Sequence, residues 1–423
     1  MSDTLKKAWG EEEIRKKFYF TLVMLLIYRL GNNIPIPFID AQKLAEAYKG
    51  MEGTLVDYLN MLTGGGLSTL SIFALGVQPY ITASIVMQLL TVVIPRLEEL
   101  TKEGEAGRKA IQKYTRYMTI FLAIFQAIAI TNGLYGAALS SATTFQKLVM
   151  NVVLIGGTML VTWMGETITE KGIGNGVSII IFMGIIANVP KTLKTWKSGL
   201  HYNTISWLSI LVMVLVVIFI VLFTVKITEG ERKVPVQYAK RVVGRKMYGG
   251  QSTHIPVKVN MSGVMPIIFA SAVLAIPSTI SLFMGKANGG LNEFFSKSTH
   301  GFVIYLIIQA ALILVFAYFY NMIQFNTVEY AKQLQQNGGF IPGIRPGKPT
   351  SDYLAKVGNK ITFIGAISLA LLTIVPALSS RFLGLNLSFG GSSVIIVVGV
   401  ILETVKQIEA MLTMKNYKGF LNR

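Results

Sequence analysis

The chain of 423 residues contains no cysteine and few charged residues. Without cysteine it can form neither disulfides nor a thiolate metal site. Charged residues make up only 14% of the chain, whereas a typical soluble domain carries about 25%. Hydrophobic residues make up 52%. This composition argues against a soluble enzyme and predicts a membrane protein.

Recognisable catalytic and nucleotide-binding motifs are also missing. The three histidines, His201, His254 and His300, all fall in predicted loops, and no HExxH motif occurs. The glycines of 172–176 do not complete a dinucleotide fingerprint, because Val177 follows them. The stretch 343–349 fails as a phosphate loop, since its glycines are too close and a proline replaces Ser or Thr. We therefore expect no enzymatic activity, no metal site and no cofactor.

Long apolar segments are the main feature of the chain. The segment 207–225 contains no ionisable residue, and about 20 such residues cross a bilayer core. We predict an all-α polytopic membrane protein with ten transmembrane helices. The expected spans are 18–31, 76–94, 117–134, 148–165, 177–190, 207–225, 262–284, 302–325, 361–378 and 391–405. The fifth is short for a full crossing, which favours a helix surrounded by protein.

The basic residues predict the orientation of these spans. The net charge is +18, from 39 Lys and Arg against 21 Asp and Glu. With the N-terminus inside, 29 of the 39 basic residues fall on the cytoplasmic side, as the positive-inside rule requires. Both termini are then cytoplasmic, and so are the two large loops, 226–261 and 326–360.

The spans divide into two groups of five, which we expect to form two halves. The N-terminal half is 1–190, the C-terminal half is 207–423, and 191–206 is an external hinge linker between them. An odd number of spans in each half places the halves in opposite orientations. This arrangement permits an inverted repeat with a site between the halves.

Ionisable residues are scarce inside the spans. Arg29, Glu166, Glu403 and Lys406 lie near span ends, where they can reach the interface. Ion-coupled transporters usually hold charged groups near the midplane, so their scarcity argues against such a permease. A permease with a neutral binding site remains open.

A Gly-rich segment, 61–75, precedes the second span and contains three successive glycines, Gly64 to Gly66. Glycine disfavours a long straight helix. The segment is either an external loop or a re-entrant segment buried in protein, and composition does not separate these alternatives. The second and seventh spans contain prolines, which can localise bending, so these two helices are candidates for moving parts.

Five long stretches, most of them rich in polar residues, carry a resemblance to a known family. They are SIFALGVQPYITASIVMQLL (71–90), EGEAGRKAIQKYTRY (103–117), ITEKGIGNGVSIIIF (168–182), QSTHIPVKVNMSGVMPIIFA (251–270) and GGFIPGIRPGKPT (338–350). With them the chain resembles the SecY family of protein-conducting channels over nearly its whole length. The resemblance implies a channel for preproteins between two inverted five-helix halves, in a bacterial plasma (inner) membrane.

The resemblance also implies site residues. A ring of aliphatic side chains forms the family's pore constriction, and the matching residues here are Val77, Ile81, Val177, Ile181, Ile268 and Ile396. Valine stands at two of these positions where isoleucine is common. The segment 62–73 resembles the family's plug, which closes the resting channel; its residues include Gly64, Gly65, Gly66, Leu67, Leu70 and Ile72. We call 62–73 the plug segment.

The second and seventh spans resemble the family's lateral gate, which releases signal sequences and membrane helices into lipid. Polar gate positions are Thr82, Gln88 and Gln126, and an apolar one is Ile276. The large loops resemble the docking surface for the ribosome and the motor ATPase SecA, with Arg245, Lys246 and Arg345 at matching positions. The expected partners are SecA, the ribosome, SecE, SecG, preproteins and membrane lipid.

Overall fold

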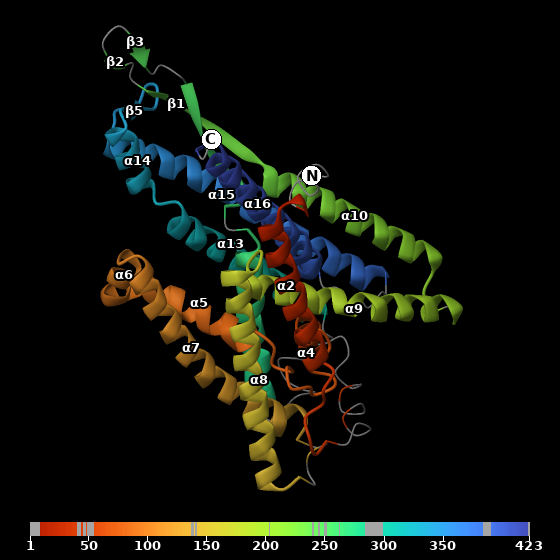
Figure 1. The fold of residues 1–423 in the computed structure, drawn as a ribbon. Helices are drawn as coiled ribbons and strands as arrows, with labels where there is room; N and C mark the ends of the chain where they lie inside the picture. The colour runs from red at the N-terminus through yellow and green to blue at the C-terminus, as the bar shows by residue number, and fades with distance from the viewer. Residues whose placement is uncertain are drawn as a thin grey trace.

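The protein is a bundle of long helices with a few short strands at one end (Figure 1). This computed structural model describes residues 9–39, 44, 48, 55–136, 139, 142–202, 204–238, 241–243, 246–248, 252–261, 263–283, 299–383 and 391–421. Ten of its helices coincide with the ten predicted spans. They are α2 (Glu12–Gly31), α5 (Gln78–Val93), α7 (Glu105–Ile128), α8 (Thr144–Lys171), α9 (Gly176–His201), α10 (Trp207–Glu229), α11 (Met265–Phe283), α13 (Thr299–Gln324), α15 (Lys348–Leu383) and α16 (Gly391–Leu421).

Not all ten helices meet the length and hydropathy expected of a membrane span. Among the described residues, six helices are long and apolar enough to cross a bilayer. A seventh joins them if α5 and the short α6 (Pro95–Lys102), bent by 100° relative to each other, form one broken span. The total of ten crossings therefore stays a prediction.

The fifth span is longer than the sequence suggested. Helix α9 continues past Pro190 to His201 and has 26 residues, so the expectation of a short helix was wrong. Most of the predicted linker 191–206 is thus the last part of α9. We placed the linker there because it falls between the two groups of five spans, but Lys191, Lys194 and Lys197 lie on a continuing helix.

The loop 226–261 forms strands, which the all-α prediction missed. Strand β1 (Glu231–Tyr238) pairs antiparallel with β4 (Ser252–Lys258) and with β5 (Gly339–Phe340). A second pair joins β2 (Arg241–Val243) to β3 (Lys246–Tyr248). Alternation explains β1, because Val234 and Val236 are buried between exposed neighbours. They pack over α14 (Thr327–Gln336) and α15, in one cluster with Leu334 and Leu354.

The strands lie at the end of the bundle where α2 begins and α16 ends (Figure 1). The central hydrophobic core combines residues from α2, α5, α8, α9, α10, α11, α13, α15 and α16. A second core lies around α8 and the π-helical turn η1 (Ala129–Leu134), which continues α7. The short helix α4 (Leu55–Leu62) leads into the plug segment and packs against α9 and α11.

Candidate pore and its closure

The six predicted ring residues all join the central hydrophobic core. Five of them (Val77, Ile81, Ile181, Ile268, Ile396) are each at most 7% exposed, and Val177 packs against the same core. They come from the start of α5, the start of α9, the start of α11 and the start of α16. The fold therefore gathers, from both halves of the chain, side chains that lie more than 300 residues apart in sequence.

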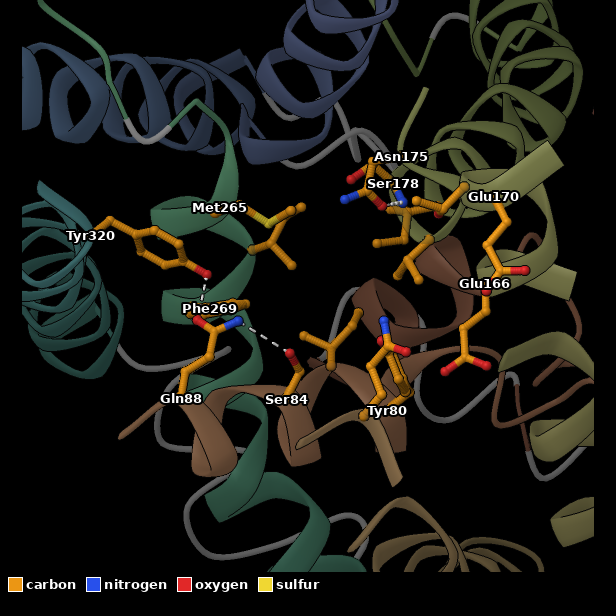
Figure 2. Close-up of a pocket in the computed structure, with 16 residues that line it drawn as sticks. Tyr80, Ser84, Gln88, Glu166, Glu170, Asn175, Ser178, Met265, Phe269 and Tyr320 are labelled. Carbon is orange, nitrogen blue, oxygen red and sulfur yellow. Dashed lines mark hydrogen bonds between the residues drawn. The ribbon is translucent and has the colours of Figure 1, made fainter. Parts of the chain in front are cut away.

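A cavity of about 270 Å³ opens against four of these side chains, Ile81, Val177, Ile181 and Ile268. Its other walls are largely polar (Figure 2). Ser84, Gln88 and Tyr320 stand on one side of it, and Glu166 and Glu170 stand on the other. The cavity thus has an aliphatic floor and walls that can bind water.

Hydrogen bonds join the polar side chains of one wall of the cavity. Tyr320 of α13 donates from Oη to Gln88 Oε1 of α5 at 2.8 Å, and Gln88 Nε2 donates to Ser84 Oγ at 3.3 Å. The Tyr320 ring also packs against Phe269 of α11, with 5.2 Å between ring centroids. Tyr320 therefore links α5, α11 and α13 beside the cavity, and no sequence motif pointed to it.

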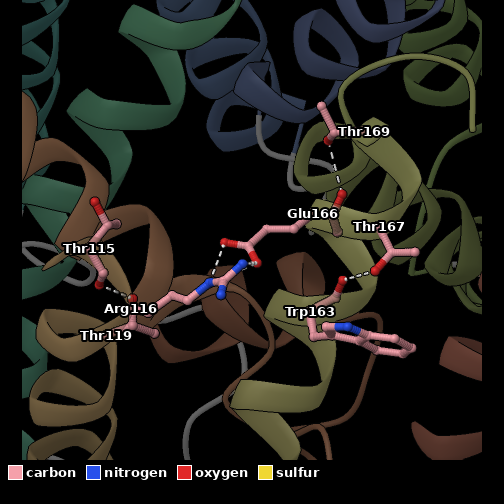
Figure 3. A network of polar contacts seen from close by, with 8 residues as sticks. Thr115, Arg116, Thr119, Trp163, Glu166, Thr167 and Thr169 are labelled. Carbon is pink, nitrogen blue, oxygen red and sulfur yellow. Dashed lines mark hydrogen bonds and ion pairs between the residues drawn. The ribbon is translucent and has the colours of Figure 1, made fainter. Parts of the chain in front are cut away.

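On the opposite wall, Glu166 forms an ion pair that the sequence did not reveal. Arg116 of α7 donates from Nη2 to Glu166 Oε2 at 2.6 Å and from Nε to the same carboxylate (Figure 3). The Glu166 side chain is 12% exposed and that of Arg116 is 48% exposed. The sequence predicted only that Glu166 lies near a span end, where it can reach the interface. The pairing explains how it can lie mostly buried.

Helices α9 and α16 run antiparallel to each other, and the contacts at the two ends of this pair define the order of the features along the pore. The backbone N–H of Gly174, before α9, donates to Gln407 late in α16 at 2.6 Å. At the other end, Met61 contacts both helices: its carbonyl accepts from Asn188 Nδ2 of α9 at 3.2 Å. Its sulfur accepts from Ser393 Oγ of α16 at 3.6 Å. Ring residues Ile181 and Ile396 lie between these two contacts.

The plug segment therefore lies on the far side of the ring from the cavity. Ser393 is three residues before Ile396, and Gly184 is three residues after Ile181, so each lies one helical turn from its ring residue. Gly64 approaches Gly184 so closely that a Cβ on it would lie 3.1 Å from the Gly184 Cα. Cavity, ring and plug segment follow one another along α9.

The plug segment is buried and irregular. Leu67, Leu70 and Phe73 are each at most 3% exposed, and Gly64 and Gly65 have φ of 72° and 91°, which favour glycine. Leu67 and Leu70 pack in the second core, whereas Ile72 packs against the central one. This burial matches the re-entrant alternative for 61–75 and excludes an exposed loop.

A model of the SecY family matches residues 71–405. The chain belongs to the SecY family. It is 43% identical to the protein translocase subunit SecY of Streptomyces galbus over 441 residues, which cover 100% of both chains. It is 43% identical to the SecY of Mycobacterium tuberculosis over 439 residues, 97% of each. To the SecY of Aquifex aeolicus it is 42% identical over 431 residues, 100% of each.

Solved structures share the SecY fold at lower identity. A structure described as a protein conducting channel has a TM-score of 0.68 at 18% identity, covering 95% of this chain and 93% of that one. Sec61 in a canine ribosome–channel complex has a TM-score of 0.61 at 17% identity, with the same coverage. These likenesses establish a common fold.

In this member of the SecY family the two candidate gate helices are in contact. Helix α11 packs against α5 and against η1. Of the four gate residues, Gln88 reaches across to another helix, through Tyr320. Thr82 donates to Gln78 O within α5, Gln126 is half-buried on α7, and Ile276 is 41% exposed on α11. The gate helices are therefore in contact, and the role of the four residues stays a prediction.

The structure describes two of the three predicted docking residues of this chain. Arg245 lies outside the described residues, and Lys246 belongs to β3. Arg345 is exposed between β5 and α15, and its carbonyl accepts a hydrogen bond from Thr350 Oγ1 at 2.8 Å. Gly343 and Gly347 flank it with φ of 79° and 96°. These turns hold Arg345 on a short, defined loop at the strand end of the bundle.

Proposed function

We propose that this chain is the central subunit of a protein-conducting channel. It moves unfolded preproteins across a bacterial plasma membrane and releases transmembrane segments sideways into lipid. The observation that carries this proposal is the order of features along α9: a polar cavity, a floor of aliphatic side chains, and a buried glycine-rich segment beyond it. Membership of the SecY family supports the same function.

The ring acts as a seal because of its chemistry. A narrow constriction of Ile and Val side chains offers water and ions no hydrogen-bond partner, so it dewets and resists conduction. Aliphatic side chains also yield to polypeptides of very different sequence, since they make no specific polar contact. Val77, Ile81, Val177, Ile181, Ile268 and Ile396 fill this role in the proposal.

The plug segment closes the channel from the other side in this proposal and leaves when a chain passes. In a structurally similar SecY protein the plug domain stabilises the closed state and maintains a membrane seal. Lateral release requires α5 and α11 to separate, with α7 and α13 beside them. Thr82, Gln88, Gln126 and Ile276 face this exit.

In this proposal SecA and the ribosome bind on the cytoplasmic side of the channel. The shared end of α2, α16 and the strands (Figure 1) supports an orientation with both termini and both large loops in the cytoplasm. There Lys246, Arg245 and Arg345 dock SecA or the ribosome, while SecE and SecG pack against the bundle. Structural neighbours support a ribosomal partner: Sec61 in a canine ribosome–channel complex and a yeast Ssh1 complex bound to the 80S ribosome.

The test is reconstitution in proteoliposomes with SecE, SecG and SecA. We expect ATP-dependent import of a signal-bearing preprotein. We also expect Ile268→Asn and Ile396→Asn to raise the ion conductance of the resting channel by at least about tenfold, because a polar side chain hydrates the constriction. Ile280→Asn, on the same helix as Ile268 but exposed, is the matched control and leaves the resting conductance unchanged. Saturable uptake of a small solute without preprotein import would overturn the proposal.

A further inference from the structure

The outer end of α2 donates three hydrogen bonds to the backbone at the start of the plug segment. Tyr28 Oη donates to the carbonyl of Thr63 at 3.1 Å, and Asn32 Nδ2 donates to the same carbonyl. Arg29 Nη1 donates to the carbonyl of Gly64 at 3.0 Å. Three side chains within two turns of one helix thus converge on two neighbouring peptide groups.

Asn32 also holds the far end of the segment. Its Oδ1 accepts a hydrogen bond from Ser71 Oγ at 3.2 Å, so one amide joins residues 63 and 71. The backbone of the plug segment also pairs with the chain after α2, where Ile72 N donates to Ile34 O at 3.0 Å. The contacts at both ends of the segment therefore come from the same short region, 28–34.

These hydrogen bonds are buried, so breaking one of them while the plug segment stays in its site is energetically unfavourable. Tyr28, Asn32 and Thr63 are at most 5% exposed, and the Tyr28 ring stacks on Phe73 with 5.9 Å between centroids. The carbonyls lie just beyond the end of α4, where a helix leaves carbonyls without intrahelical partners. Each of these hydrogen bonds stabilises the buried position of the segment, so removing one donor favours the segment's departure to water.

We propose that Tyr28, Arg29 and Asn32 form a latch that holds the plug segment in its resting position. This inference rests on the channel function proposed above and names the residues that set how readily the channel opens. The latch is reversible because it consists of hydrogen bonds from side chains to backbone carbonyls, which both partners replace with water after release. Arg29, half-buried at the end of its span, can be hydrated where it stands.

The absence of cysteine allows a direct measurement of latch release. Leu67→Cys places a single thiol on a plug residue that is 3% exposed. Its reaction with a maleimide, measured on the protein in detergent without SecA or preprotein, reports how often the segment leaves its site. We expect Tyr28→Phe and Asn32→Ala to accelerate labelling by about tenfold each, equivalent to about 1.4 kcal/mol.

Asn33→Ala is the matched control. Asn33 is the neighbouring asparagine, but it is exposed, and among the described contacts its side chain donates only to the carbonyl of Arg29, at 2.8 Å. Its replacement leaves the labelling rate unchanged. Tyr28→Phe removes one oxygen atom and keeps the ring stack, so it decides the question if Asn32→Ala does not fold.

Unchanged labelling in folded Tyr28→Phe protein would overturn the latch, and so would equal acceleration in Asn33→Ala. Preprotein import by the otherwise unaltered Leu67→Cys protein is measured in parallel. If import is present and labelling does not respond to the variants, the latch fails and the channel function stands. If import is absent from both this protein and the wild type, the channel function fails.

Discussion

At the scale of single residues, the Arg116–Glu166 pair shows how an ionised carboxylate is kept beside an aliphatic constriction. Glu166 is mostly buried and lines the cavity, and Arg116 meets it through two nitrogens. Removing one member of such a pair leaves the other charge poorly solvated. Charge-assisted, two-point contacts of this kind also fix the relative position of two helices, here α7 and α8.

We expect Arg116→Ala to destabilise the protein by about 1–3 kcal/mol, because Glu166 loses its partner. Glu166→Gln in the same chain restores most of this loss, since a neutral amide tolerates the site. Lys102→Ala is the control: Lys102 pairs with Glu98 at 2.7 Å in the open, and this hydrogen bond and charge raise the pKa of Lys102. Exposed pairs of this kind contribute little to stability, because water screens them.

Thermal unfolding in detergent measures these effects, with the double variant completing the cycle. A strictly additive double variant would show that the two side chains do not interact. Equal losses of thermal stability from Arg116→Ala and Lys102→Ala would show that the burial of Glu166 does not make the loss of its partner more destabilising.

At the scale of elements, the sequence predicted the helices well, because an apolar segment in a bilayer must satisfy its backbone within itself. The strands around Val234 and Val236 were missed because their alternation is short and surrounded by charged residues. Contacts such as Asn32 with Ser71 or Gly174 with Gln407 leave no local pattern, since each joins segments far apart in the chain. The ring and plug residues were predicted through the family resemblance, and their burial was not readable from any one segment.

The loop between α8 and α9 illustrates an element whose role depends on such distant contacts. The Ile173 N–H donates to Thr21 Oγ1 of α2 at 3.1 Å, and the Gly174 N–H donates to Gln407 Oε1 of α16. Gly174 has a φ of 80°, and Gly176 passes so close to the Gly165 carbonyl that no side chain fits. The glycine run is therefore a joint that ties α2, α8, α9 and α16 together, and not a nucleotide loop.

We expect Gln407→Ala to lower the stability of the protein by about 1–2 kcal/mol, because it leaves the partly buried Gly174 N–H without an acceptor. Gln407→Glu keeps an acceptor oxygen at the same reach and preserves stability more fully. Thermal unfolding in detergent, with both variants prepared alike, compares them. Equal destabilisation by the two substitutions would assign the effect to lost packing.

At the scale of the whole molecule, the fold separates a polar end from the membrane-spanning bundle. The strands, the start of α2, the end of α16 and the loop of Arg345 gather at one end (Figure 1). The ring, the cavity and the plug segment lie within the bundle and depend on packing among both halves. A substitution on the exposed loops can therefore impair partner binding without altering the seal, which separates docking from gating experimentally.

Arg345→Glu is the substitution that tests this separation. Arg345 is exposed on a loop whose backbone is fixed by the Thr350 hydrogen bond and two glycine turns, and its guanidinium can make a forked contact to a carboxylate or phosphate. We expect the initial rate of SecA-driven import to fall by about tenfold or more, because a charge-assisted contact becomes repulsive. Resting conductance and thermal stability stay at wild-type values, since Arg345 supports neither the ring nor the core.

Lys332→Glu, an exposed change of equal charge on α14, has a much smaller effect if position rather than total charge matters. Measured SecA affinity must fall in parallel with import. Wild-type import by Arg345→Glu, or an equal defect in Lys332→Glu, would reject a specific docking role for this side chain.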